Sequence, residues 1–488
     1  MERAPSPGPS PFAPRRLECA PAAPGARRGD ALTPKDKDPT DPFAHDDPVA
    51  RAASDPDAFD TLGFDTGFGM TPGAPAASRQ DDDPTPPTGM YVGEEVQVLD
   101  PSAIGRALAE AEGEPDDDLA MPDLAALQKG LVGIDLGASG AVVSRFDKKG
   151  RHEIVQNEHD ERLTPVAIFF DDDGELIIGR EARQMAPSAP GQSILNLKDM
   201  ISRPGFKLAP GGPHGELDAP RILSLFLARL LEYAAVGASP PTHLALAAPA
   251  WFGPTERQVL ARAVEMLDVT LVGTTDECLA GAVPYSLRLP DLNPRTALVF
   301  DLGHAALGVG LVRCASGDIT VLAQGARRDL GGQAWDQLLA DEAARKLRQV
   351  HGVDPLLDEG SRIDLLLRAE EAKKALSQRA QAALVVSAGG KSLKVGFTRP
   401  AFEEAARGLV QRSIEFAREV RQKGGVQRWE DIDAVILTGG GCKTPIVRQA
   451  LAKETGHEAE RGTGMEEGVA LGALYWGIGE RYRASKKR

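Results

Sequence analysis

A short unit occurs twice in this chain of 488 residues. In each copy an apolar run ends in Asp-Leu-Gly and is followed by small residues and a second apolar run; the copies span residues 131–143 and 296–312. Each copy predicts a β-hairpin with a tight glycine turn. Because the copies lie about one domain length apart, they indicate two related lobes rather than a solenoid, whose repeats are shorter.

Other strand and helix patterns alternate along the chain between and after these hairpins. Apolar runs typical of strands occur at residues 167–170, 244–247, 384–386 and 434–437. Helical periodicity lies between them, at roughly 220–235, 254–267, 333–350, 362–379, 400–423 and 445–454. Strands that alternate with helices favour an α/β fold.

The repeated unit carries residues that suit a nucleotide triphosphate. Glycines such as Gly137 and Gly303 let backbone amides approach phosphates, and Asp135 and Asp301 can reach the hydrated magnesium that accompanies ATP. A single Asp-Leu-Gly occurs by chance in many chains, but two copies after buried strands are more specific. A third strand runs into three glycines over residues 435–441, where open α/β sheets bind ligands; the alternative is a flexible loop.

The first part of the chain differs in composition from the rest. Residues 1–128 hold 20 of the 37 prolines, and residues 1–130 hold 25 of the 71 Asp and Glu residues. Such a segment cannot bury enough apolar surface to offset the entropy of ordering, so we expect a disordered acidic tail with a short helix at 101–112. Its role as a docking or localisation arm and its role as a solubilising tail stay open.

Several classes of protein are disfavoured by the remaining composition. Beyond residue 130 the chain is nearly neutral, with 46 acidic and 45 basic residues, which disfavours nucleic-acid binding. No apolar stretch after Met1 suits a secretory signal or a membrane helix. The four cysteines have no CxxC pair, so we expect reduced thiols in a cytoplasmic protein.

The three glycine-bearing elements, in this order, resemble the phosphate 1, phosphate 2 and adenosine motifs of the superfamily of actin, sugar kinases and heat-shock chaperones. In particular the chain resembles the ATPase domain of the heat shock protein 70 (DnaK-like) family over residues 131–478. The passages that carry this resemblance are residues 162–165, 178–182, 249–252, 257–258, 330–332, 369–377 and 469–473.

The resemblance implies a two-lobed actin-like (ribonuclease H-like) α/β fold with duplicated sheets. It places lobe I at residues 129–310 and lobe II at 311–480, between the tail of residues 1–128 and a basic stub at 481–488. The expected ligands are ATP and magnesium, the latter held mainly through water by Asp135, Asp301 and Glu277.

The resemblance also assigns roles to individual residues. Lys198, Glu277, Asp301 and Asp135 match the catalytic positions, and Pro249 and Arg257 match a pair that relays the nucleotide state to a partner domain. Residues that match nucleotide-binding positions are Gly137, Ala138, Ser139, Gly303, Gly331, Gly332, Glu370, Lys373, Lys374, Ser377, Gly439, Gly440, Lys443 and Glu466.

The phosphate and adenine positions depart from the family pattern. Ala138 and Ser139 stand where the family has two threonines, and residues 304–308 read His-Ala-Ala-Leu-Gly where it has Gly-Gly-Thr-Phe-Asp. Lost groups of this kind cost about 2–4 kcal/mol of barrier each, so hydrolysis should be slow. Lys374 and Lys443 replace arginines that sandwich the base, and lysine lacks a planar face for stacking.

We therefore expect an Hsp70-like ATP-dependent switch with a weakened ATPase activity. The sequence ends soon after the ATPase-like region, so we expect no peptide-binding domain, and a protein partner that contacts the tail or the outer lobe surface. One alternative is a degenerate pseudo-ATPase that acts as a scaffold or nucleotide sensor. A less favoured one is a small-molecule kinase of the same fold.

Overall fold

The structure is a computed structural model. It describes residues 90–91, 123–210, 215–235, 237, 239–289, 293–315, 318–460 and 464–486. The expected disordered tail lies almost entirely outside the described residues, and so does the expected helix at 101–112.

The first large sheet is built around the first Asp-Leu-Gly hairpin. Its strand order is β12-β11-β2-β3-β4, and β5 pairs with β3. The strands are β2 (Leu131–Leu136), β3 (Gly140–Phe146), β4 (His152–Ile154), β5 (Leu163–Pro165), β11 (His243–Ala248) and β12 (Thr270–Asp276). Strand β3 is antiparallel to β2, whereas β11 is parallel to it.

The second large sheet repeats this arrangement around the second hairpin. Its order is β1-β15-β14-β13-β18, formed by β1 (Met90–Tyr91), β13 (Arg295–Leu302), β14 (Leu307–Ala315), β15 (Asp318–Arg327) and β18 (Ala434–Thr438). Strand β14 is antiparallel to β13 and β18 is parallel to it, as β3 and β11 are to β2. The predicted α/β fold with duplicated sheets is confirmed. The expected lobe boundary at residue 310 falls within β14.

Within the described residues, three smaller sheets lie outside the two large ones. They are β6 (Ile168–Phe170) with β7 (Leu176–Ile178) and β8 (Ser193–Ile194), β9 (Lys207–Leu208) with β10 (Leu217–Asp218), and β16 (Gln381–Ala388) with β17 (Lys391–Thr398).

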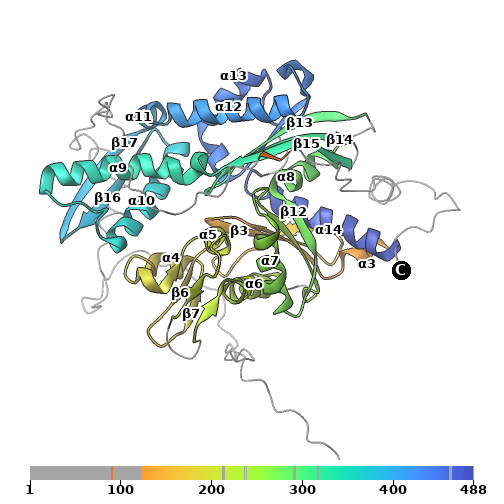
Figure 1. The fold of residues 1–488 in the computed structure, drawn as a ribbon, viewed down its shortest axis with the longest axis horizontal. Coiled ribbons are helices and arrows are strands. Elements are labelled where there is room, and N and C mark those ends of the chain that lie inside the picture. The colour runs from red at the N-terminus through yellow and green to blue at the C-terminus, as the bar shows by residue number, and fades with distance from the viewer. Residues whose placement is uncertain are drawn as a thin grey trace, which may run out of the picture. The chain divides into compact units, whose positions relative to one another are not determined.

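Two helices lie between the large sheets (Figure 1). Helix α8 (Glu277–Ser286) packs against β13 and β14, and α14 (Gly468–Lys486) packs against β2 and β11. The two helices cross closely, because a Cβ on Gly472 would lie 1.8 Å from the Ala280 carbonyl oxygen. A buried cluster that includes Leu131, Val299 and Leu474 therefore joins both sheets.

The other helices cover the outer faces of the sheets and the smaller β-structures. Helix α6 faces the first sheet with Ile222, Phe226 and Leu230, which are fully buried and spaced by four residues. The expected helix at 400–423 is divided at Ala406. The helices are α3 (Leu124–Gln128), α4 (Arg180–Met185), α5 (Leu197–Ile201), α6 (Ala219–Ala235), α7 (Pro254–Glu265), α9 (Gly332–His351), α10 (Glu359–Gln378), α11 (Arg399–Ala405), α12 (Arg407–Lys423) and α13 (Pro445–Thr455).

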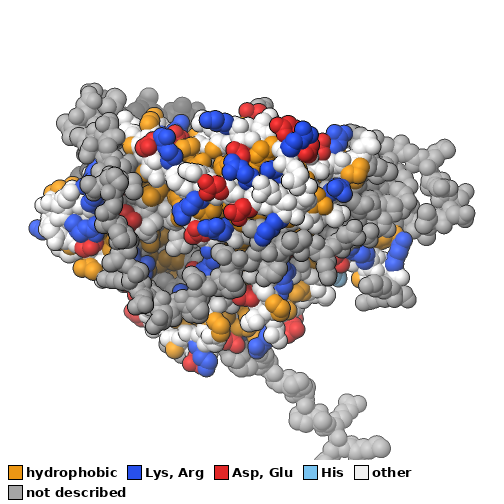
Figure 2. Space-filling model, turned by 45° about the horizontal axis from the view of Figure 1, so that its top comes forward, with side chains coloured by type: hydrophobic (Ala, Val, Ile, Leu, Met, Phe, Trp, Pro, Cys, Tyr) orange, Lys and Arg blue, Asp and Glu red, His pale blue; other side chains and the backbone are white. Residues whose placement is uncertain are grey.

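The exposed side chains carry both signs of charge. On the face seen in Figure 2, basic and acidic side chains are interspersed rather than gathered by sign. None of the helices in the described ranges is long and apolar enough to cross a membrane.

Candidate functional site

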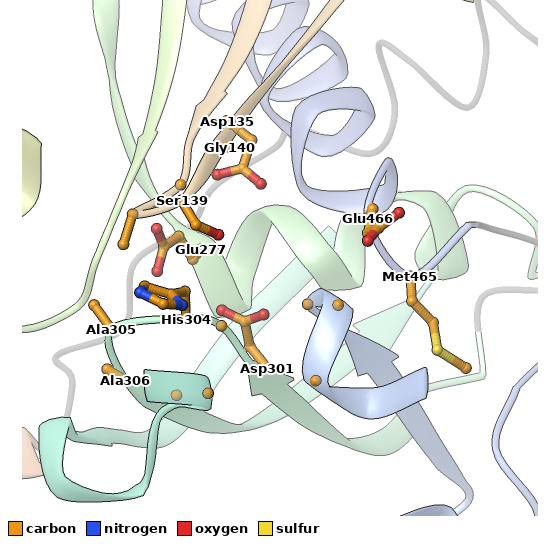
Figure 3. A pocket seen from close by; sticks show the side chains of 18 of the residues that line it. Asp135, Ser139, Gly140, Glu277, Asp301, His304, Ala305, Ala306, Met465 and Glu466 are labelled. Carbon is orange, nitrogen blue, oxygen red and sulfur yellow. The ribbon is translucent and has the colours of Figure 1, made fainter. Parts of the chain in front are cut away.

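The two hairpins and the start of α8 bring three carboxylates together in one cavity of about 460 Å³. Asp135 lies at the end of β2 and Asp301 near the end of β13, and Glu277 opens α8. The carboxylates of Asp135 and Asp301 point into the same space from the two hairpins, with Glu277 between them (Figure 3). The sheet register explains this convergence, because each aspartate stands in the last strand pair but one before the turn of its own hairpin.

Lys198 is held at the same place by the short helix α5. The Asn196 side chain caps this helix by accepting a hydrogen bond from the Asp199 amide, which fixes Lys198 at its first turn. The Lys198 ammonium forms an ion pair with Glu277, and the two side chains are only 8% and 14% exposed. Burial alone would lower the pKa of Lys198, but Glu277 and Asp135 raise it above its usual value.

The carboxylates outnumber the single ammonium group that faces them. Burial, and then repulsion from Glu277, raises the pKa of Asp301 to about 7, although the Thr438 hydroxyl donates a hydrogen bond to its Oδ1 at 3.0 Å. Burial and Glu277 also raise the pKa of Asp135 well above its usual range. Such an excess of buried oxygen ligands fits a hydrated magnesium ion, which needs one or two carboxylates.

Glycines shape the walls beside these carboxylates. A Cβ on Gly137 would lie 2.2 Å from the Gly140 carbonyl oxygen in the first turn. Gly439 has a φ of 80°, and its Cβ would lie 2.4 Å from the Leu302 carbonyl oxygen. Only glycine fits such positions, so bare backbone faces the cavity, as phosphate groups require.

The two glycines of the Gly331-Gly332 pair, predicted together as a nucleotide-contacting turn, have different positions. Gly332 lines the cavity, but Gly331 lies behind it. A Cβ on Gly331 would lie 2.4 Å from the Ala306 amide nitrogen. Gly331 therefore allows the turn after β13 to rest on the start of α9.

Glu370 on α10 lines the cavity and is the centre of a charged group that joins α10 to α4. It is 4% exposed and forms ion pairs with Lys374, at 2.9 Å, and with Arg183 on α4. Burial would raise the pKa of Glu370, but Arg183 and Lys374 hold it well below its usual range. Arg183 belongs to the segment between β7 and β8 of the first half, so this pair ties the two halves together.

The remaining predicted adenosine residues are also brought together. Lys373 Nζ lies 2.8 Å from Asp336 and donates to the Gly332 carbonyl oxygen at 3.0 Å. Lys443 Nζ lies 2.5 Å from Glu466. Also lining this end of the cavity are Ser377, Gly440 and Thr444.

The positions that depart from the family pattern line the same cavity. Ala138 and Ala306 present methyl groups where the family pattern has threonines, and Ser139 keeps one hydroxyl. Gly308 pairs with Asp301 across the hairpin, and its hypothetical Cβ lies 3.8 Å from Asp301 Oδ2. A carboxylate at residue 308 would therefore have stood directly beside Asp301.

Some lining residues were missed by the sequence analysis. Arg448 is an exposed guanidinium on α13 that lines the cavity, and Met465 and Trp251 add apolar surface. The signal for Arg448 was its position in the first turns of the helix that follows the three glycines. Arg183 does not line the cavity itself but pairs with Glu370, and it was overlooked because that partner is distant in sequence.

The pair expected to relay the nucleotide state leads away from the cavity. Pro249 lines the cavity. Arg257 on α7 binds Asp276 at 2.5 Å and the Thr274 hydroxyl at 2.8 Å. Asp276 also accepts a hydrogen bond from Gln324 on β15, at 2.8 Å, and it precedes Glu277. The chain of contacts thus runs from Glu277 to β15 of the second sheet.

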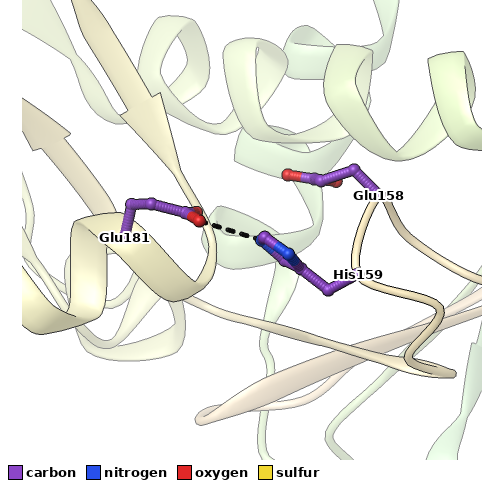
Figure 4. A group of neighbouring side chains, drawn as sticks. All are labelled: Glu158, His159 and Glu181. Carbon is purple, nitrogen blue, oxygen red and sulfur yellow. Dashed lines mark ion pairs between the residues drawn. The ribbon is translucent and has the colours of Figure 1, made fainter. Parts of the chain in front are cut away.

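A separate group of potential metal ligands lies outside this cavity. Glu158, His159 and Glu181 offer ligand atoms within 4.8 Å of one another. His159 Nε2 and Glu181 Oε1 are already paired at 2.9 Å (Figure 4). We assign this pair to the packing of α4 against the loop before β5.

Comparison with known proteins agrees with the resemblance seen in the sequence. The profile described as Hsp70 protein matches residues 131–208 and 211–478. Chaperone protein DnaK from two strains of Halobacterium salinarum is 29% identical over 355 residues, which cover 71% of this chain and 55% of DnaK. The chain spans about half the length of these curated relatives. It belongs to the Hsp70 protein family.

Proposed function

We propose that this protein binds Mg-ATP between its two sheets and acts as a nucleotide-dependent conformational switch with slow ATP hydrolysis. One observation carries the proposal: Asp135, Asp301, Glu277 and Lys198 face one cavity whose walls are glycine-rich backbone. Glu370, Lys443 and Glu466 at its other end would hold adenosine. Bound magnesium would neutralise phosphate charge, with Asp135, Asp301 and Glu277 holding it mainly through water.

Two residues would carry the hydrolytic step. Lys198 would neutralise charge on the transferred phosphoryl oxygens, and Glu277 would orient the water that attacks phosphorus. The water oxygen forms the new bond to phosphorus, the bond to the ADP oxygen breaks, and a proton is released. The loss of hydroxyl and carboxylate groups at Ala138, Ala306 and Gly308 supports a low rate.

A second candidate is a pseudo-ATPase that binds nucleotide as a scaffold or sensor, favoured by the same three substitutions. In both cases we propose a cytoplasmic protein whose output passes to a protein partner through the tail or the outer lobe surface.

Calorimetric titration of Mg-ATP into the full chain, followed by phosphate release on the same sample, tests the proposal. We expect binding, and release that Lys198→Ala and Glu277→Gln abolish, while Lys391→Ala, at an exposed lysine, changes nothing. Binding without release would support the sensor. Absence of binding would overturn the proposal.

A further inference from the structure

The second hairpin places an imidazole directly after its Asp-Leu-Gly, at His304. The corresponding residue of the first hairpin is Ala138. Both residues line the candidate nucleotide cavity, and Figure 3 shows the His304 ring on the same side as Glu277, Asp301 and Ala306. The side chain thus stands in the turn that would cradle phosphate groups, where the family pattern has glycine.

The backbone on both sides of His304 is fixed. The Gln333 amide donates to the His304 carbonyl oxygen at 2.8 Å, and the Gly303 amide donates to the Ala306 carbonyl oxygen at 3.0 Å. The ring is therefore carried by a turn held at both ends, and it is only 22% exposed. A side chain in such a position is preorganised for a ligand.

The two ring nitrogens have different surroundings. His304 Nδ1 is buried and lies 3.6 Å from Asp336 Oδ2, within ion-pair range but without a hydrogen bond. Nε2 has no hydrogen-bond partner among the described residues, and unlike Nδ1 it is not fully buried. Asp336 therefore lies on one side of the ring, and Nε2 is the nitrogen left accessible to a ligand.

We propose that His304 binds the phosphate groups of the nucleotide through Nε2, with Asp336 as the residue that positions the ring. This inference rests on the proposed function, because it assigns a contact within the same cavity. It gives the altered second turn a binding role in place of the lost threonine and aspartate. An imidazolium between the Asp336 carboxylate and a phosphate would be stabilised from both sides.

The contact makes phosphate binding depend on pH. The charged groups that face the ring come from three helices: Asp336 on α9, Glu370, Lys373 and Lys374 on α10, and Arg183 on α4. Burial, against the opposing effect of Glu370, lowers the pKa of His304 to about 4, so the ring is neutral at pH 7 before a ligand binds. A polyphosphate raises that pKa, the ring takes up a proton, and binding strengthens as the pH falls.

The test compares Mg-ATP and adenosine as ligands of the full chain between pH 6 and pH 8. We expect His304→Ala to weaken Mg-ATP binding about tenfold at pH 6, less at pH 8, and to leave adenosine binding unchanged. Since the ionisation of ATP itself is common to both proteins, the difference isolates His304. His351→Ala, at an exposed histidine on α9, is the matched control.

The outcomes separate this inference from the proposed function. Equal Mg-ATP affinity of His304→Ala and the parent protein at every pH would overturn the role of His304 and leave nucleotide binding intact. Equal losses for Mg-ATP and adenosine, independent of pH, would assign His304 to packing and also overturn it. His304→Gln, which keeps a polar side chain but cannot gain a proton, should lose the pH dependence. If neither protein binds nucleotide, both proposals fail.

Discussion

Neutralising one of the clustered carboxylates should stabilise the ligand-free protein. Burial raises the pKa of Asp301 from 3.8 to about 7, so the folded protein binds this proton more tightly than the unfolded chain does. The sign follows from proton linkage: stability is highest below pH 3.8 and is lost as the pH rises toward 7. Asp301→Asn removes the charge, yet its side-chain oxygen can still accept the Thr438 hydrogen bond.

The size of this effect follows from the same pKa values. A carboxyl whose pKa moves from 3.8 to about 7 destabilises the folded state by about 4 kcal/mol at pH 8. Water entry and local relaxation reduce such penalties, so we expect Asp301→Asn to raise the free energy of unfolding by about 2–4 kcal/mol at pH 8. Near pH 4 we expect almost no gain, because Asp301 is then protonated in the folded protein.

The assay is urea denaturation of both proteins at pH 4, 6 and 8, with a chelator present and nucleotide absent. Asp173→Asn, at an exposed carboxylate in a turn, controls for the general loss of a negative charge. A lower stability of Asp301→Asn at pH 8, or a gain equal at all three pH values, would refute the reasoning. Magnesium and ATP should reverse the order of the two proteins, because only the parent keeps the carboxylate for the ion.

Three further changes test other parts of the site. Gly439→Ala should lower the free energy of unfolding, measured by denaturation, by about 2 kcal/mol or more, because Gly439 has a positive φ and lies close to the Leu302 carbonyl. The control Gly408→Ala, at an open helical position, should not destabilise the protein. Arg183→Ala should increase the release rate of a fluorescent ATP analogue about tenfold in stopped flow, because it removes the ion pair with Glu370 that links α4 to α10. Gly308→Asp should lower the magnesium concentration needed for half-maximal nucleotide binding, because it adds a carboxylate beside Asp301.

Each of these expectations has an opposite result. Equal stability of Gly439→Ala and the parent protein would mean that the turn after β18 relaxes freely. An unchanged release rate in Arg183→Ala would show that the ion pair does not retain nucleotide; Arg407→Ala, at an exposed pair with Glu404, is the control for the lost charge. A higher magnesium requirement in Gly308→Asp would mean that residue 308 does not face the ion.

The elements that the sequence predicted best are those with strong local patterns. The two Asp-Leu-Gly hairpins and β18 are buried strands that end at glycines, and α6 and α10 lie close to their expected ranges. Among the short strands of the smaller sheets, β6 lies within the run predicted at 167–170, whereas β7, β8, β9 and β10 were missed because two or three residues carry no periodicity. Helix α14 was also missed, since it is buried nearly all around and rich in glycine, so it shows no polar face.

The candidate site shows the same limit in three dimensions. The loop motifs predicted that Asp135 and Asp301 belong to the site. The raised pKa values of these two residues depend mainly on burial, which a motif does not reveal. The tie between Arg183 and Glu370 joins positions far apart in the chain. The proximity of Asp336 to His304 likewise depends on the packing of α9 against the hairpin turn, which the sequence does not predict.

On the proposed function, the substitutions in the two hairpin turns would affect the rate of hydrolysis more than the conformational switch. A ligand shifts a conformational equilibrium by its difference in affinity for the two states, whatever its rate of hydrolysis. On the proposed function, the ion pair between Arg183 and Glu370, which reaches both halves, would contribute to that difference. If one lost group raises the barrier by about 2–4 kcal/mol, bound ATP persists roughly 30- to 1000-fold longer. On the proposed function, the altered turns therefore lengthen the ATP-bound state without removing the means to reach it.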